Sequence, residues 1–169
     1  MLNKISQLWS IVEQEKIEVF YEDIKTAPEE LNGLYFYNQN VGFIILLDKT
    51  LLHQRRKHNE VLAEEVGHHF AGVGTNVLFA SMDYTAQIRR NSDENRAMLW
   101  ATNFLIPDNE LMHAVHREKL RSCYELADYF DVTQGFFMQK LILIKQCFRR
   151  TGLKVKGRDI LGFDLSSCF

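Results

Sequence analysis

The 169-residue sequence lacks most of the features that would assign it to a specialised class of protein. Its formal net charge is only -2, which gives no electrostatic reason to expect a nucleic acid as a direct partner. No apolar run approaches the roughly 20 residues that a bilayer-spanning helix needs. The first residues also lack the apolar stretch and small-residue cleavage site of a signal peptide. We therefore expect a cytoplasmic protein with no membrane partner.

Cysteine and proline are also scarce. Cys123, Cys147 and Cys168 are odd in number and far from any C-x-x-C spacing, so we expect reduced thiols. The sequence contains two prolines, and no internal repeat or low-complexity linker divides it. Hydrophobic residues make up 46% and charged residues 25%, which is ordinary for a soluble globular protein. A chain of this length predicts one domain over residues 1–169.

The pattern of apolar residues predicts an α+β fold that is mostly helical, with a small antiparallel sheet. The sheet-containing part covers about 1–50, with a helix over Leu2–Gln14 and strands over Ile17–Tyr21, Leu34–Tyr37 and Val41–Leu47. A second part, about 52–70, is one helix. The helical part, about 93–148, begins at a cap on Asp93 and stops at Pro107, and further helices are predicted over Glu110–Arg117 (capped by Asp108), Tyr124–Phe130 and Phe136–Phe148 (capped by Thr133).

Two segments are less regular. Ala71–Ser92 is expected to be a long loop that covers a site or holds a short element. Asp159–Leu165 is expected to be a final strand or tail. The sheet edge within Leu34–Leu47 could receive an extended peptide as an added strand.

The helix over 52–70 carries residues with the spacing of a metal site. Positions four apart on a helix differ by about 40° around its axis, so Glu64 and His68 project to the same side. Glu65 lies about 100° from Glu64, within reach of the same centre. Catalytic zinc sites commonly take three protein ligands, and Glu94 at the start of the next helix is a suitable third donor. Glu65 would then act as the base that activates water for attack on a peptide carbonyl.

Two oddities favour a site over the plain alternative, a solvated glutamate-rich face. Glu60 and Glu64 are like charges four residues apart, an arrangement that is mildly destabilising unless something neutralises it. Gly67 lies in mid-helix at a cost of about 1 kcal/mol relative to alanine, which a close approach of another element would explain.

Three segments, in this order, resemble the ImmA/IrrE family of metallopeptidases. Leu62–His69 is similar to the family's L-A-H-E-x-G-H-x helix, Glu94–Pro107 to its E-x-x-A-x-x-F-A-x-x-L-L-x-P helix, and Tyr124–Thr133 to its C-terminal helical segment. The resemblance implies that Glu65 is the catalytic base and that Glu64, His68 and Glu94 bind the metal. It also implies a zincin-like endopeptidase that cleaves a helix-turn-helix transcriptional repressor of a phage or mobile element, as in prophage-type members.

The chain departs from the usual family pattern at Glu64, which stands where the family has histidine. Two glutamates and one histidine place two negative charges on the ion and should weaken its Lewis acidity. Oxygen-rich ligation also shifts the preference from zinc towards harder ions such as manganese. A second register is open as well, because Glu65 and His69 are also four residues apart. Gly67 and Leu62-Ala63 align with the family in the first register, which we prefer.

Two other functions compete with the peptidase. The first is a catalytically weak or inactive peptidase-like protein that binds a regulatory partner, and Glu64 is the residue that favours it. The second is a DNA-binding regulator, because Tyr124–Leu143 has a helix-turn-helix pattern. The early turns of its second helix offer mainly Phe136, Phe137 and Met138 in place of base-reading side chains, so we expect a packed core there.

Overall fold

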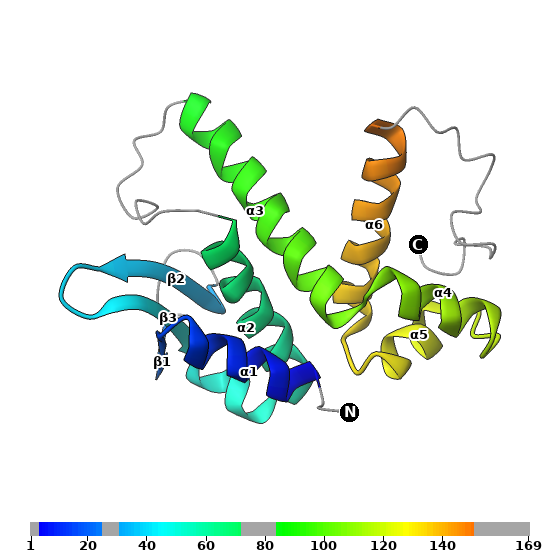
Figure 1. Ribbon diagram of the computed structural model, residues 1–169, viewed down its shortest axis with the longest axis horizontal. Coiled ribbons are helices and arrows are strands. Elements are labelled where there is room, and N and C mark those ends of the chain that lie inside the picture. Colours follow the sequence, from blue (N-terminus) through cyan, green and yellow to red (C-terminus); the bar gives the residue numbers. More distant parts are fainter. Residues whose placement is uncertain (1–3, 25–30, 72–83, 151–169) are drawn as a thin grey trace. The chain divides into compact units, whose positions relative to one another are not determined.

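The computed structural model describes residues 4–24, 31–71 and 84–150, with the side chains of 84–91 and 148–150 left out (Figure 1). Two compact units follow one another, Met1–Ala101 and Thr102–Phe169. The described elements are α1 (Lys4–Gln14), β1 (Ile17–Glu22), β2 (Gly33–Asn38), β3 (Gly42–Asp48), η1 (Lys49–His53), α2 (Arg55–Phe70), α3 (Tyr84–Leu105), α4 (Asp108–His116), α5 (Cys123–Tyr129) and α6 (Gln134–Arg150). The predicted α+β class, mostly helical with one small sheet, is confirmed. The single domain over 1–169 stays a prediction.

The sheet is mixed, so the prediction of an antiparallel sheet was wrong for one of its two strand pairs. The strand order is β1-β3-β2, with β1 parallel and β2 antiparallel to β3. The most apolar strand, β3, takes the centre, where Ile45 and Leu47 are fully buried. The turn after β2 is short and forces an antiparallel pair, whereas ten residues separate β1 from β2 and let the chain reach the other edge. The alternation pattern of a strand reports burial and not direction.

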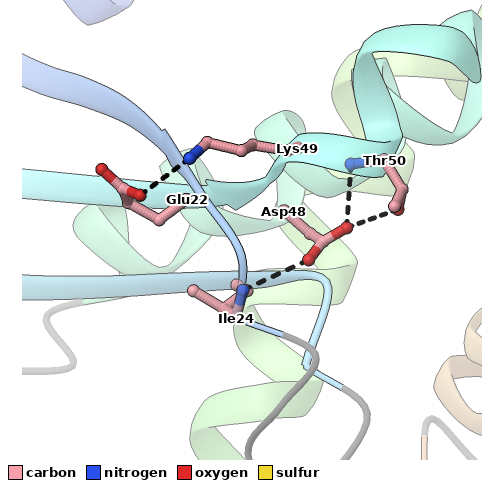
Figure 2. A network of polar contacts seen from close by, with 5 residues as sticks. All are labelled: Glu22, Ile24, Asp48, Lys49 and Thr50. Carbon is pink, nitrogen blue, oxygen red and sulfur yellow. Dashed lines mark hydrogen bonds and ion pairs between the residues drawn. The ribbon is translucent and has the colours of Figure 1, made fainter.

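A buried carboxylate joins the ends of β1 and β3 in the first unit. Asp48 is 1% exposed and accepts hydrogen bonds from the backbone N–H of Ile24 (3.3 Å), the backbone N–H of Thr50 (2.9 Å) and the Thr50 hydroxyl (Figure 2). The same carboxylate caps η1. Nearby, Lys49 and Glu22 form an ion pair of 3.1 Å between two well-exposed side chains. Asp48 therefore stabilises the connection between β3 and η1 and ties it to the segment that follows β1.

The helix α2 begins later than predicted. The residues from Lys49 to His53 form a 3-10 turn, and the α-helix starts at Arg55. Its inner face packs on β2 and β3 through the buried residues Val61, Leu62, Ala63 and Val66. Helix α1 packs on β1 and α2 through Leu8 and Val12. Both helices of this part of the chain are thus anchored on the sheet.

The helix α3 is longer than predicted. A loop was expected as far as Ser92, with a cap at Asp93, yet the backbone is helical from Tyr84. Asp93 lies inside the helix and pairs with Arg96 at 3.9 Å. The glycines that suggested a loop all precede this segment, and 84–92 contains no glycine or proline to end a helix. The remainder of the predicted loop, 72–83, lies outside the described residues. The predicted stop before Pro107 is confirmed.

The second unit contains α4, α5 and α6. Asp108 was expected to cap α4, but Pro107 occupies the cap position and Asp108 is the first helical residue. Its carboxylate lies 2.6 Å from the ammonium of Lys140, a side chain that is 1% exposed. Thr133 caps α6 as predicted, since its hydroxyl accepts the N–H of Phe136 at 3.2 Å. Phe136 and Phe137 are buried, which confirms that the start of α6 is core.

Two further expectations concern cysteines and membranes. Cys147 is a free, exposed thiol, but Cys123 is disulfide-bonded, so the expectation of reduced thiols was wrong for Cys123. The distance between cysteines along the sequence does not report their distance in the folded chain. None of the helices in the described ranges is long and apolar enough to cross a membrane. The predicted terminal segment Asp159–Leu165 lies outside the described residues.

Candidate metal centre

The structure brings together the three predicted ligands. Glu64 and His68 belong to α2, and Glu94 belongs to α3. One ligand atom from each of the three lies within 4.8 Å of the others. The Nε2 of His68 and a carboxylate oxygen of Glu94 are 3.4 Å apart. Residues thirty positions apart in sequence therefore converge on one point in the first unit.

A glycine lets the two helices approach. A β-carbon at Gly67 would lie 2.5 Å from the carbonyl oxygen of Ala97 and 3.1 Å from its Cα. Any side chain at position 67 would push α3 away from α2. The close approach that was expected from a mid-helix glycine is confirmed, and it occurs one turn from Glu94.

The charged groups of the cluster shift the pKa values of Glu64 and His68 in opposing directions. Burial raises the pKa of Glu64 most, the positive charge of His68 lowers it, and the carboxylates of Glu94 and Glu60 raise it again. For His68, burial lowers the pKa, but the hydrogen bond that the ring donates to Glu94 and the charges of the surrounding carboxylates outweigh it, so the net pKa is raised. The repulsion between Glu60 and Glu64 that the sequence suggested is therefore present: Glu60 is buried and raises the pKa of Glu64.

Glu65 lies beside this cluster and is buried. Its burial raises the pKa to about 8, opposed by the charge of His68 and by the backbone N–H of Tyr35, which donates to the carboxylate. Gly33 on β2 faces the same carboxylate, and a β-carbon there would collide with Oε1 of Glu65 and lie 2.6 Å from Val61. Glu65 thus occupies a slot between α2 and β2.

The donor set fits a divalent metal ion. Two carboxylates and one imidazole are ligands that zinc and manganese both accept. Glu94 has half of its side chain exposed and His68 13%, so the cluster is reachable from solvent. The carboxylates of Glu64 and Glu94 repel each other in this partly buried place, and a bound cation would relieve that repulsion.

The alternative register is not the one that forms. His69 turns away from the cluster: its Nδ1 lies 2.9 Å from the Tyr35 hydroxyl and its Nε2 lies 3.3 Å from the Glu15 carboxylate. Gly33 and Tyr35 lie against Glu65, Glu15 contacts His69, and all three residues were missed in the sequence. Their only signal was long-range contact between segments that local spacing cannot report.

A convergent Glu/His/Glu cluster beside a buried glutamate on a helix is the arrangement of a metallopeptidase-like protein. A family model described as the IrrE N-terminal-like domain (Peptidase_M78) matches residues 12–141. The chain belongs to this peptidase family, which confirms the resemblance seen in the sequence. No curated protein and no solved structure gave a match. The match covers both the cluster and the helices that follow it.

Proposed function

We propose that the protein is a metal-dependent endopeptidase that cleaves a protein substrate, a helix-turn-helix transcriptional repressor of a phage or mobile element. The observation that carries the proposal is the convergence of Glu64, His68 and Glu94 within 4.8 Å, beside the buried Glu65. Membership of a peptidase family supports the reaction class. The repressor substrate rests on the resemblance to ImmA/IrrE proteins.

In this proposal Glu64, His68 and Glu94 hold zinc or manganese. The ion, when bound, supplies Lewis acidity that polarises the scissile carbonyl. The three side chains come from two helices that meet at Gly67, so they are oriented before the ion arrives. Two carboxylates neutralise a divalent charge completely, which favours manganese more than a site with a single carboxylate would.

Glu65 is the proton carrier. A carboxyl group with its pKa raised to about 8 holds a proton easily at neutral pH. A cation held by Glu64 and Glu94 would offset the repulsion that their carboxylates exert on Glu65, and this favours the carboxylate form, in which Glu65 can take a proton from water. The carboxylate gains a proton as water attacks the peptide carbonyl and returns it to the leaving amine when the C–N bond breaks. The backbone N–H of Tyr35 orients the carboxylate during both transfers.

The strand β2 offers a place for an extended substrate. It lies at an edge of the three-stranded sheet and runs past Glu65 through Gly33 and Tyr35. A peptide that added to this edge would place its backbone beside the carboxylate. Side chains of the substrate would then alternate between the two faces of the sheet.

The test is cleavage of a purified helix-turn-helix repressor from the same mobile element by the manganese- or zinc-loaded protein, followed by intact-mass spectrometry. We expect two fragments whose masses sum to the repressor plus one water. The Glu65→Gln variant should bind metal normally and yield no fragments. Equal fragments from wild type and Glu65→Gln would contradict the proposal, because the cleavage would then come from a contaminant.

A second function is favoured by one observation, the carboxylate at position 64 where the family has histidine. Two negative charges on the ion would lower its activating power, and the protein would then bind a regulatory partner without cutting it. Stable co-elution of the uncut repressor with the metal-loaded wild type would support this function over the peptidase.

A further inference from the structure

A chain of three hydrogen-bonded side chains ends at the strand that touches Glu65. Glu15 follows α1, His69 lies in the last turn of α2, and Tyr35 is in the middle of β2. The Glu15 carboxylate lies 3.3 Å from Nε2 of His69, and Nδ1 of His69 lies 2.9 Å from the Tyr35 hydroxyl. Three elements that are distant in sequence are thereby tied together.

The direction of these hydrogen bonds follows from the groups. A carboxylate can only accept, so Nε2 of His69 carries the hydrogen that points to Glu15. In the neutral ring, Nδ1 is then the acceptor, and the Tyr35 hydroxyl donates to it. Each group has one defined role. The two hydrogen bonds therefore fix both the position and the orientation of the Tyr35 ring.

The ring of His69 is packed as well as bonded. It meets the ring of Phe43 edge-on, with 4.6 Å between the ring centres, and that of Tyr35 with 5.7 Å between them. Its side chain is 11% exposed. Since β2 is an edge strand, β3 holds it on one side only within the described sheet. The tie from Tyr35 to His69 adds a link from β2 to α2.

The other end of this arrangement is the Glu65 carboxylate. Tyr35 donates its backbone N–H to that carboxylate, and Gly33 leaves room for it. A shift of β2 away from α2 would lengthen this hydrogen bond and widen the space around the Glu65 carboxylate. We propose that Glu15, His69 and Tyr35 are positioning residues that hold the Tyr35 N–H against Glu65. Their effect on catalysis rests on the proposed peptidase function.

The chain provides a matched control. Tyr21 on β1 also donates or accepts a hydrogen bond with a histidine of α2, with 2.8 Å between its hydroxyl and Nε2 of His58. This second tyrosine–histidine pair links a strand to the same helix but does not reach Glu65. Loss of the Tyr21 hydroxyl therefore reports the general effect of removing such a link.

The experiment measures hydrogen exchange of the residue 35 amide by NMR in the metal-free full chain. We expect Tyr35→Phe and Glu15→Gln to speed this exchange by roughly tenfold relative to Tyr21→Phe, the factor that loss of one hydrogen bond gives. Glu65→Gln is the reference for a weakened acceptor. Equal exchange in Tyr35→Phe and Tyr21→Phe would overturn the proposal. Glu15 is 42% exposed at its side chain, so Glu15→Gln should fold even if Tyr35→Phe does not.

A second experiment measures the cleavage kinetics of the same variants with the intact repressor as the substrate. For Tyr35→Phe we expect kcat to fall by about tenfold with KM nearly unchanged, because a misplaced base affects the transition state more than binding. Metal affinity should stay at the wild-type value. A rise in KM with kcat unchanged would overturn the positioning role. If the wild type cleaves nothing, the peptidase proposal fails, and amide exchange still decides whether the three residues hold Tyr35 on Glu65.

Discussion

A β-carbon at Gly67 would stand 2.5 Å from the carbonyl oxygen of Ala97, so these two residues determine how closely α2 and α3 can approach. Glu94 lies one turn before Ala97, and His68 directly follows Gly67. Because Gly67 has no side chain in front of the Ala97 carbonyl, the two helices approach closely, and Glu94, the third predicted ligand, lies near Glu64 and His68. Neither residue has a chemical role of its own.

Replacement of Gly67 by alanine should therefore damage both stability and metal binding. We expect Gly67→Ala to lower the free energy of unfolding by about 2 kcal/mol, since overpacking against backbone cannot be relieved by a rotamer change. Gly135→Ala in α6 is the matched control, because a β-carbon there would meet only the Thr133 hydroxyl at 4.0 Å. The control should be neutral or stabilise by about 0.5 kcal/mol. Urea denaturation of both variants makes the comparison, and equal effects would contradict the account of Gly67.

Glu64 should control which ion the protein prefers. The Glu64→His variant replaces a carboxylate by an imidazole and leaves one negative charge among the three ligands. We expect its affinity for zinc relative to manganese to rise by about tenfold over the wild type. Competition between the two ions, read by mass spectrometry of the bound metal, measures the ratio. An unchanged ratio would mean that Glu64 is not a ligand.

Asp48 should contribute far more to the free energy of unfolding than the ion pair of Lys49 and Glu22 beside it. Asp48→Ala removes the acceptor of three donors at a buried position, which we expect to cost about 3 kcal/mol. Glu22→Gln breaks an ion pair between exposed side chains (Figure 2) and should cost less than about 0.5 kcal/mol. Thermal unfolding of the two variants separates the effects. Similar melting temperatures would show that the buried network is not what joins β1 to β3.

Stability of the metal-free protein should fall as the pH rises from about 5 to 8. The pKa of Glu65 is raised by burial from 4.5 to about 8, so the folded state holds a proton that the unfolded state loses. Stability from this group is complete below pH 4.5 and is lost as the pH passes 8. The raised pKa values of Glu64 and His68 act in the same direction.

The variant Glu65→Gln removes the largest of these contributions. Its melting temperature should depend less on pH over this range than that of the wild type, measured without metal by calorimetry. Parallel curves for the two proteins would show that Glu65 titrates normally in the folded state. Saturation with metal should flatten the wild-type curve, because a cation stabilises the carboxylate form.

Local patterns were enough to predict most of the helices and to select Glu64 and His68 of α2 as candidate ligands on one side of a helix. Glu64 and His68 are four residues apart, and helical geometry alone places them on one side. Thr133 as a cap and Pro107 as a stop are also local signals, and both were confirmed. Asp93 misled because aspartate is a good cap and also an acceptable helix residue when a basic partner follows at Arg96.

Long-range contacts were beyond such patterns. The direction of β1 relative to β3 depends on the path of the connecting segment, which the strand residues do not encode. The hydrogen bonds that link His69 with Tyr35 and with Glu15 join residues 34 and 54 positions apart. In the sequence His69 was therefore an open alternative as a ligand, whereas in the folded chain its two ring nitrogens contact Tyr35 and Glu15.

Metal binding tests the central claim most directly. Calorimetric titration of the metal-free protein with manganese or zinc should give one ion per chain for the wild type. His68→Ala and Glu94→Ala should each weaken binding by at least about 100-fold, since each removes one of three ligands. His116→Ala, an exposed histidine on α4, should bind as the wild type does. Absence of binding by the wild type, or equal binding by His68→Ala, would contradict the account.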